Sequence, residues 1–320
     1  MLDRRDLLGL GMAAGALAAL PVRAAAAAAT PQRIPLWPRL PEPVPPGLRQ
    51  TFVERSKDPA VQDRALSGVS APWLDHFRPS QGNGAAIIAI PGGGYRHMAW
   101  DKEALDIAAW FAARGIAGFA LAYRLPHDGW RGGLDTPLAD AQRAVRLVRS
   151  RAAEWGIDPQ RIAVVGFSAG GHLTANLAAQ FAHQTYAPQD EADRLSARPD
   201  LAAPIYPATL LKDLAAQMPT GEPLFGRAMD ETEMARHSPH LQVPADAPPH
   251  FLVHAEDDPL VGPEHTLALR AAVKARRVPV ETHLFDRGGH GFGIRNTAGL
   301  PVADWPDRLI AFGRTTGWIR

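Results

Sequence analysis

The stretch VVGFSAGGHL, residues 164–173, decides the expected fold. It places Ser168 between glycines, where an apolar run ends and a helix-forming stretch begins. The run Gly166-Phe167-Ser168-Ala169-Gly170 fits the pattern G-x-S-x-G, in which the serine lies on a sharp strand-to-helix turn. Glycines two positions before and after the serine let strand and helix pass without clashing Cβ atoms. This context favours a nucleophilic serine over a turn that is rich in glycine for packing alone.

Strand-like apolar runs alternate with helical patterns on both sides of this turn. Strands separated by helices of this length predict an α/β fold with a mostly parallel sheet and helices on both faces. Ligands of such sheets bind at the carboxyl ends of the strands, and glycine-rich stretches follow two of these ends, after Ile90 and after Phe167. The expected strands are 73–79, 85–94, 116–123, 161–167, 201–207, 250–256 and 280–285. The expected helices are 101–115, 138–157, 169–182, 263–277 and 304–317.

Two of the helices carry polar residues whose roles need an interpretation. Asp101 is placed to cap the helix 101–115, and Gly115 to end it. The helix 138–157 carries arginines at three-residue spacing, which we expect on a solvated face rather than at an anion site: Arg143, Arg146 and Arg149.

A serine hydroxyl is a poor nucleophile until a base takes its proton. The base is expected to be a histidine oriented by a carboxylate, and in this architecture the chain order is serine, acid, histidine. The stretch GGHGFG, residues 288–293, follows the last expected strand and presents His290 on a glycine-rich loop. His290 is therefore predicted to be the base rather than a core histidine.

The acid comes from HAEDDPLVG, residues 254–262, which follows a strand. It offers three carboxylates: Glu256, Asp257 and Asp258. We expect Asp258, which stands immediately before Pro-Leu-Val at the start of the loop, to orient the histidine. Asp257 is the alternative; its other possible roles are to cap a helix or to brace the loop.

An oxyanion formed during acyl transfer needs hydrogen-bond donors. The stretch PGGGY, residues 91–95, supplies backbone N–H groups that no side chain covers, and we assign Gly93 and Gly94 to this role together with the N–H of Ala169. A phosphate-binding loop is a weak alternative, because no Gly-Lys-Ser/Thr follows and no G-x-G-x-x-G is complete.

The remaining histidines give no metal-ligand pattern, so the sequence predicts neither a metal nor a cofactor. There is no H-E-x-x-H, and four histidines lack ligand spacing: His237, His240, His250 and His254. His254 lies inside an expected strand and is interpreted as structural.

The polar, proline-rich excursion 208–248 is a candidate wall of the substrate pocket. Its apolar side chains could equally pack in the core: Met218, Phe225 and Met229. Tyr95 and Phe225 are our candidates for contact with substrate.

Composition excludes several classes of function. The 320 residues carry a net charge of +1, which gives no basic excess for nucleic acid binding. The chain contains no cysteine, so no disulfide supports the fold and no thiol does chemistry. The expected partner is a small-molecule or oligosaccharide substrate.

The first residues have the features of an export signal. Arg4 and Arg5 precede an apolar stretch from Leu7 to Leu20, followed by small residues. This stretch is short for a bilayer span, and Arg-Arg followed by Asp-Leu-Leu resembles the twin-arginine signal of bacteria. Residues 1–26 are thus predicted to direct the protein through the twin-arginine machinery to the periplasm or outside the cell, without membrane insertion after cleavage. An uncleaved anchor is the alternative.

Two further divisions complete the expected organisation. Residues 27–50 are rich in proline and are predicted to run extended over the surface. Residues 51–320 are predicted to form a single catalytic domain.

With these motifs in hand, the chain resembles the α/β-hydrolase superfamily, and within it the acetyl-xylan and feruloyl esterase-like group, relatives of the hormone-sensitive-lipase-type esterases. The resemblance covers Ile34 to the C-terminus and rests on motifs in the expected order: PLWP (35–38), PGGGY (91–95), AYRLP (122–126), GFSAGGHL (166–173), EDDPLV (256–261) and GGHGFG (288–293). Many lipase-type relatives have histidine where this chain has Pro91, which favours the carbohydrate-esterase side.

The resemblance implies a serine esterase with an acyl-enzyme intermediate. Ser168 would be the nucleophile, Asp258 the orienting acid and His290 the general base. Acetylated or feruloylated plant polysaccharide fragments would be the substrates, and an exported enzyme that deacetylates sugars or xylo-oligosaccharides is the leading hypothesis. A lipase-type short-chain carboxylesterase, an amidase or peptidase on the same fold, and a non-enzymatic binding module are the alternatives.

Overall fold

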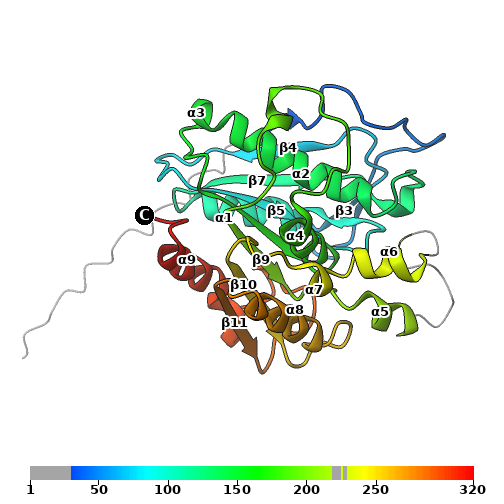
Figure 1. Cartoon of the computed structure of the whole chain (residues 1–320). Helices are drawn as coiled ribbons and strands as arrows, with labels where there is room; N and C mark the ends of the chain where they lie inside the picture. Colours follow the sequence, from blue (N-terminus) through cyan, green and yellow to red (C-terminus); the bar gives the residue numbers. More distant parts are fainter. Residues whose placement is uncertain (1–29, 218–224, 226–228) are drawn as a thin grey trace, which may run out of the picture.

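The computed structural model describes residues 30–217, 225 and 229–320 (Figure 1). An eight-stranded sheet forms the centre of this part of the chain. The strands are parallel from β7 to β11, whereas β4 runs antiparallel to both of its neighbours. The order across the sheet is β1 (Gln32–Pro35), β4 (Trp73–Phe77), β7 (Ala117–Ala122), β5 (Ala86–Ile90), β8 (Ile162–Phe167), β9 (Leu201–Ile205), β10 (His250–Ala255) and β11 (Val280–Phe285).

Helices cover both faces of the sheet, as the alternation of strands and helices predicts (Figure 1). Side chains of alternate strand positions point to opposite faces. Ile88 therefore packs in one core with the helices α2 (Asp135–Ser150) and α4 (Ala169–Gln180). Ile87 packs in the other core with α1 (Asp106–Ala112) and α9 (Trp305–Thr316), while α8 (Glu264–Ala275) packs against Leu252 of β10.

All seven expected strands are present, and β1 is an addition that the sequence did not predict. Within the proline-rich segment, Gln32–Pro35 form an extended strand, in which Ile34 pairs with Leu74 at the sheet edge. The segment does not lie wholly on the surface, however, because Ile34, Leu36 and Trp37 are buried. Prolines are tolerated at the end of an edge strand, where the missing N–H breaks no ladder bond.

The expected helix 101–115 is in fact two elements, and Asp101 does not cap it. A π-helical turn, η1 (Asp101–Leu105), precedes α1. The Asp101 carboxylate instead accepts hydrogen bonds from the backbone N–H and the guanidinium of Arg64. Gly115 follows the helix with φ +83°, in agreement with its expected role as the stop.

The arginine stripe of α2 is not a solvated face, so that prediction is wrong: Arg143 is buried, and Arg146 and Arg149 are half-buried with partners in the protein. Arg143 is 2% exposed and pairs with Asp190 and Asp193. Arg146 donates to the hydroxyl of Tyr186 and to the carbonyl of Leu195, and Arg149 pairs with Asp200. The stripe therefore fastens the segment 186–200 to α2. Carboxylates and carbonyls far along the chain satisfy these guanidinium groups.

Further elements lie outside the central sheet. The expected helix 138–157 begins earlier and divides into α2 and α3 (Ala152–Trp155). A small antiparallel sheet consists of β2 (Thr51–Glu54), β3 (Arg64–Ser67) and β6 (Met98–Ala99). The excursion 208–248 contains short helices: α5 (Leu211–Gln217), α6 (Glu231–Arg236) and α7 (Pro239–Gln242). Over the described ranges no helix has the length and apolar character to cross a bilayer. The predicted signal segment 1–26 and Met218 lie outside the described residues.

Candidate active site

Ser168 lies on the turn between β8 and α4, as the sequence predicts. Its backbone has φ +53° and ψ −116°, a conformation that is strained for any residue with a side chain. A Cβ on Gly166 would come within 2.1 Å of the carbonyl oxygen of Gly170, and a Cβ on Gly170 within 2.2 Å of that of Ile90. Both glycines are thus required where strand, helix and the end of β5 meet.

The structure brings Ser168, His290 and Asp258 into one hydrogen-bonded chain. His290 Nδ1 lies 2.6 Å from Asp258 Oδ2, and His290 Nε2 lies 2.8 Å from Ser168 Oγ. A carboxylate only accepts, so Nδ1 carries the proton and donates it. Nε2 is then the free lone pair, and it accepts the hydrogen bond of the serine hydroxyl.

The Asp258 carboxylate is buried and fully engaged. Oδ2 faces His290, and Oδ1 accepts from the backbone N–H groups of Leu260 (2.9 Å) and Val261 (3.0 Å). Burial opposes its ionisation, but the hydrogen bonds from His254, His290 and Val261 outweigh burial and hold the pKa of Asp258 well below its usual range. The Asp258 carboxylate is therefore ionised at neutral pH, where it accepts the hydrogen bond of His290.

His254 contacts both the Asp258 carboxylate and the backbone of the loop that follows it. Its Nε2 donates to the carbonyl of Val261 (2.8 Å) and lies 3.3 Å from Asp258 Oδ2. Its Nδ1 therefore accepts from the hydroxyl of Thr266 (2.7 Å). The sequence interpretation of His254 as a structural residue agrees with this, but its contact with the acid was not foreseen.

Asp257 braces the histidine loop instead of orienting the ring. Its Oδ1 accepts from the N–H groups of Gly288 (2.9 Å) and Gly289 (2.7 Å), immediately before His290. Glu256 is exposed. Of the three carboxylates that the sequence offered, Asp258 alone is placed against His290 in the described part of the chain.

The glycines of PGGGY lie against the serine turn. A Cβ on Gly92 would be 2.9 Å from Ser168 Cβ, and Gly93 and Gly94 take φ values of +128° and +63°. The amide of Gly92 donates to Glu103 (2.9 Å). In the ranges that the structure covers, the amides of Gly93, Gly94 and Ala169 have no acceptor within the protein. These three N–H groups are the ones that the sequence assigned to an oxyanion.

Tyr95 and Phe225 pack together beneath this loop. Both are buried, with ring centroids 5.4 Å apart, and His172 of α4 contacts both. His172 Nε2 faces the carbonyl of His237 and must donate to it, so Nδ1 accepts from the Tyr95 hydroxyl (2.7 Å). Burial lowers the pKa of His172 to about 4, which keeps the ring neutral in this role.

Tyr95 thus anchors the glycine loop from inside the protein. It is 2% exposed, and substrate contact through Tyr95 or Phe225 stays a prediction. Met229 is partly buried against the same core. No cluster of three or more potential metal ligands occurs among the described residues.

The BD-FAE family model matches residues 74–273, more than half of the chain. The chain belongs to this family of α/β-hydrolases. The match spans the serine turn and the acid loop, and with the sheet order it confirms the fold and family that the motifs predicted.

Two proteins that are similar to this chain in sequence are named as enzymes that act on xylan. The chain is 30% identical to an acetylxylan esterase of Xylanibacter ruminicola over 68% of this chain and 43% of that protein. It is also 30% identical to endo-1,4-beta-xylanase B of Butyrivibrio fibrisolvens over 66% of this chain and 33% of that protein. The chain therefore spans less than half the length of these two relatives.

A solved structure covers nearly the whole length of both chains. The acetyl ester-xyloside bifunctional hydrolase from Caldicellulosiruptor lactoaceticus aligns with a TM-score of 0.74 and 32% identity, over 91% of this chain and 98% of that chain.

Sequence reasoning missed two buried polar residues that contact the glycine loop: His172, which bonds to Tyr95, and Glu103, which bonds to Gly92. His172 stands one helical turn after Ser168 in the quoted stretch, a spacing that places it on the same side of α4. Glu103 is buried beside Ala104, and a buried carboxylate needs a partner, but the local sequence does not identify that partner.

Proposed function

We propose that this protein is a carboxylic ester hydrolase that works through Ser168, His290 and Asp258. The observation that carries the proposal is the 2.8 Å contact between Ser168 Oγ and His290 Nε2 on a strained turn. Three backbone amides without a protein acceptor adjoin this turn in the described chain. Together they supply the nucleophile, the base and the oxyanion donors of acyl transfer.

In the first half of the reaction, Ser168 Oγ attacks the carbonyl carbon of the ester as His290 Nε2 takes the hydroxyl proton. The carbonyl oxygen becomes an oxyanion, which the amides of Gly93, Gly94 and Ala169 stabilise. His290 then gives its proton to the leaving alcohol as the ester C–O bond breaks. Asp258 stabilises the imidazolium that exists between these two transfers.

In the second half, water attacks the acyl-serine. His290 takes a proton from the water and later returns a proton to Ser168 Oγ, which releases the carboxylic acid. His290 thus accepts and donates a proton once in each half of the reaction.

Acetyl esters of sugars or xylo-oligosaccharides are the proposed substrates. The names of the Xylanibacter esterase and the Caldicellulosiruptor hydrolase support this class. We also propose that residues 1–26 direct export to the periplasm or beyond, from the twin-arginine pattern at Arg4 and Arg5. N-terminal sequencing of the exported protein tests this second point.

The test of the chemistry combines Ser168→Ala with a substrate panel. Wild type should hydrolyse p-nitrophenyl acetate, and a fluorophosphonate probe should label it at Ser168. Ser168→Ala should lose about 10⁵-fold or more in kcat and all labelling, with its melting temperature retained. Retained activity in this variant would exclude Ser168 as the nucleophile.

The panel should contain acetylated xylo-oligosaccharides, methyl ferulate and acyl esters of increasing chain length. Preference for acetylated xylo-oligosaccharides supports the sugar esterase. Equal rates on simple short-chain esters would replace it with a general carboxylesterase.

A further inference from the structure

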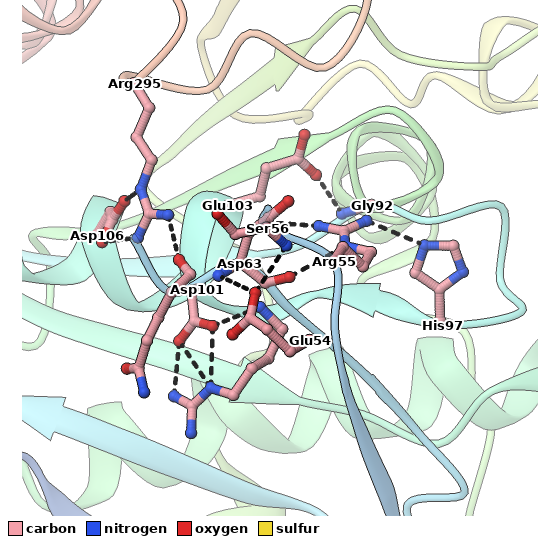
Figure 2. Close-up of polar contacts among 12 residues, drawn as sticks. Glu54, Arg55, Ser56, Asp63, Gly92, His97, Asp101, Glu103, Asp106 and Arg295 are labelled. Atoms are coloured by element: carbon pink, nitrogen blue, oxygen red, sulfur yellow. Dashed lines mark hydrogen bonds and ion pairs between the residues drawn. The ribbon is translucent and has the colours of Figure 1, made fainter. Parts of the chain in front are cut away.

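Glu103 is a buried carboxylate that none of the reaction steps above uses. It is 3% exposed and lies in η1, the π-helical turn between β6 and α1. Single π-helical turns next to α-helices occur frequently at functional sites. Figure 2 shows Glu103 with its carboxylate directed at Gly92, where the glycine loop begins.

One oxygen of Glu103 holds the start of the oxyanion loop. The Gly92 N–H donates to Oε2 at 2.9 Å. A Cβ on Gly92 would meet both Ser168 Cβ (2.9 Å) and Glu103 Oε2 (3.0 Å), so serine, glycine and carboxylate are in direct contact. Because this bond fixes the Gly92 amide, it also fixes the positions of the next two N–H groups, those of Gly93 and Gly94.

The other oxygen reaches the histidine loop through Tyr206. The Tyr206 hydroxyl donates to Glu103 Oε1 (3.0 Å) and accepts from the Gly293 N–H (3.1 Å), three residues after His290. The Tyr206 ring lies 5.0 Å from the His290 ring, centroid to centroid. Tyr206 has φ +38°, a strained backbone conformation that persists only where the surrounding structure over-determines it and that is frequent at active sites.

The turn that carries Glu103 is itself tethered at both ends. Asp101 pairs with Arg64 of β3, and Asp106, which follows η1 directly, pairs with Arg295 in the loop after His290. Figure 2 shows Asp101, Glu103, Asp106 and Arg295 gathered in one polar cluster. The Asp106–Arg295 pair therefore adds a second link between this turn and the loop that carries His290.

We propose that Glu103 is a positioning residue that keeps the oxyanion loop and the His290 loop in register with Ser168. The inference rests on the proposed esterase mechanism, because both loops act on the same tetrahedral intermediate. A carboxylate suits this role since Gly92 and Tyr206 are both donors and need two acceptors. A glutamine provides one acceptor and places an NH₂ group against the second donor.

A purely structural role makes a different prediction. If Glu103 served only to satisfy two buried donors, its loss would lower the stability and leave the turnover of the folded protein unchanged. The experiment must therefore separate kcat from stability.

The test uses Glu103→Gln, Tyr206→Phe and the double variant on p-nitrophenyl acetate. Misplaced oxyanion donors should lower kcat of Glu103→Gln by about 10²-fold, with KM within about threefold of wild type. A trifluoromethyl ketone, which forms a tetrahedral adduct with a serine, should lose affinity in parallel with kcat. Asp101→Asn is the matched control, because it changes a buried carboxylate of the same turn that bonds to neither loop.

Asp101→Asn should lower the melting temperature without the loss of kcat. In the double variant, the introduced glutamine side chain is free to give its oxygen to Gly92 because the Tyr206 hydroxyl is gone. The kcat of the double variant should therefore equal that of Tyr206→Phe within about threefold, instead of showing the product of the two losses.

Three results overturn the inference: full kcat in folded Glu103→Gln, equal losses of kcat in Glu103→Gln and Asp101→Asn, or additive losses in the double variant. If Glu103→Gln does not fold, Tyr206→Phe alone decides, and unchanged kcat in that variant overturns the inference. These outcomes differ from failure of the proposed function, in which wild type neither hydrolyses the ester nor reacts with the fluorophosphonate.

Discussion

Replacing Asp258 by asparagine isolates the part that the acid plays in the proton-transfer chain. The amide oxygen can still accept from the N–H groups of Leu260 and Val261, as Oδ1 does at 2.9 and 3.0 Å. The NH₂ group then stands where Oδ2 meets His290 Nδ1 at 2.6 Å. Two donors cannot share this contact, so His290 must change its tautomer.

The new tautomer carries its proton on Nε2, 2.8 Å from Ser168 Oγ. The base can no longer accept the serine proton, and no charge balances the imidazolium. A change of tautomer at this position in serine hydrolases lowers kcat by about 10⁴-fold. This corresponds to about 5 kcal/mol of transition-state stabilisation.

Asp257→Asn is the matched control in the same loop. Asp257 uses one oxygen to accept from Gly288 and Gly289, and an asparagine oxygen accepts both bonds equally well. This variant should lose less than about tenfold in kcat, since a neutral acceptor weakens the bonds without removing them.

Steady-state kinetics on p-nitrophenyl acetate, with circular dichroism to confirm folding, measures both variants. Two results would refute the reasoning: kcat of Asp258→Asn within about tenfold of wild type, or a larger loss in Asp257→Asn than in Asp258→Asn. Either result would move the acid assignment away from Asp258.

Two further predictions concern stability. Burial lowers the pKa of four histidines from 6.5 to about 4, namely His76, His172, His250 and His265. Between about pH 4 and pH 6.5 the unfolded chain therefore binds more protons than the folded protein. The free energy of unfolding should be highest above about pH 6.5 and fall as the pH drops toward about 4; equal urea stability at about pH 7.5 and about pH 5 would contradict this. Arg143→Ala should lower the free energy of unfolding by about 3–5 kcal/mol because Asp193 loses its buried partner. Arg194→Ala, at an exposed ion pair with Glu191, should change it by about 1 kcal/mol or less, and equal losses in the two variants would contradict the buried role of Arg143.

Local patterns were sufficient to predict the central strands and the serine turn. Buried parallel strands are continuous apolar runs, and a glycine on each side of Ser168 indicates close packing before any contact is known. His290 and Asp258 were predictable for the same reason, because each follows a strand and parallel strands bring their carboxyl ends to one edge of the sheet.

Features that depend on distant partners were not predictable in this way. The arginine stripe of α2 has the spacing of a solvated helix face, and only the acidic segment around Asp190 and Asp193 turns Arg143 into a buried residue. Asp101 has the position of a cap, yet Arg64 from another sheet engages it. The charge and spacing of these side chains can be seen in the local sequence. Their burial depends on segments elsewhere in the chain, which the local sequence does not identify.

Glu103 shows why the same limit applies to the site. Its partners are Gly92, eleven positions before it, and Tyr206, which lies beyond the nucleophile at the end of β9. Neither pairing follows a helical or strand repeat. The strand ends bring the reacting groups to one edge of the sheet, but a fold of this kind also requires the loops between them to be held at ångström accuracy. A buried carboxylate with two bound donors, one from each loop, meets this requirement, and so the residues that hold a site in place are to be sought among the buried charges beside it.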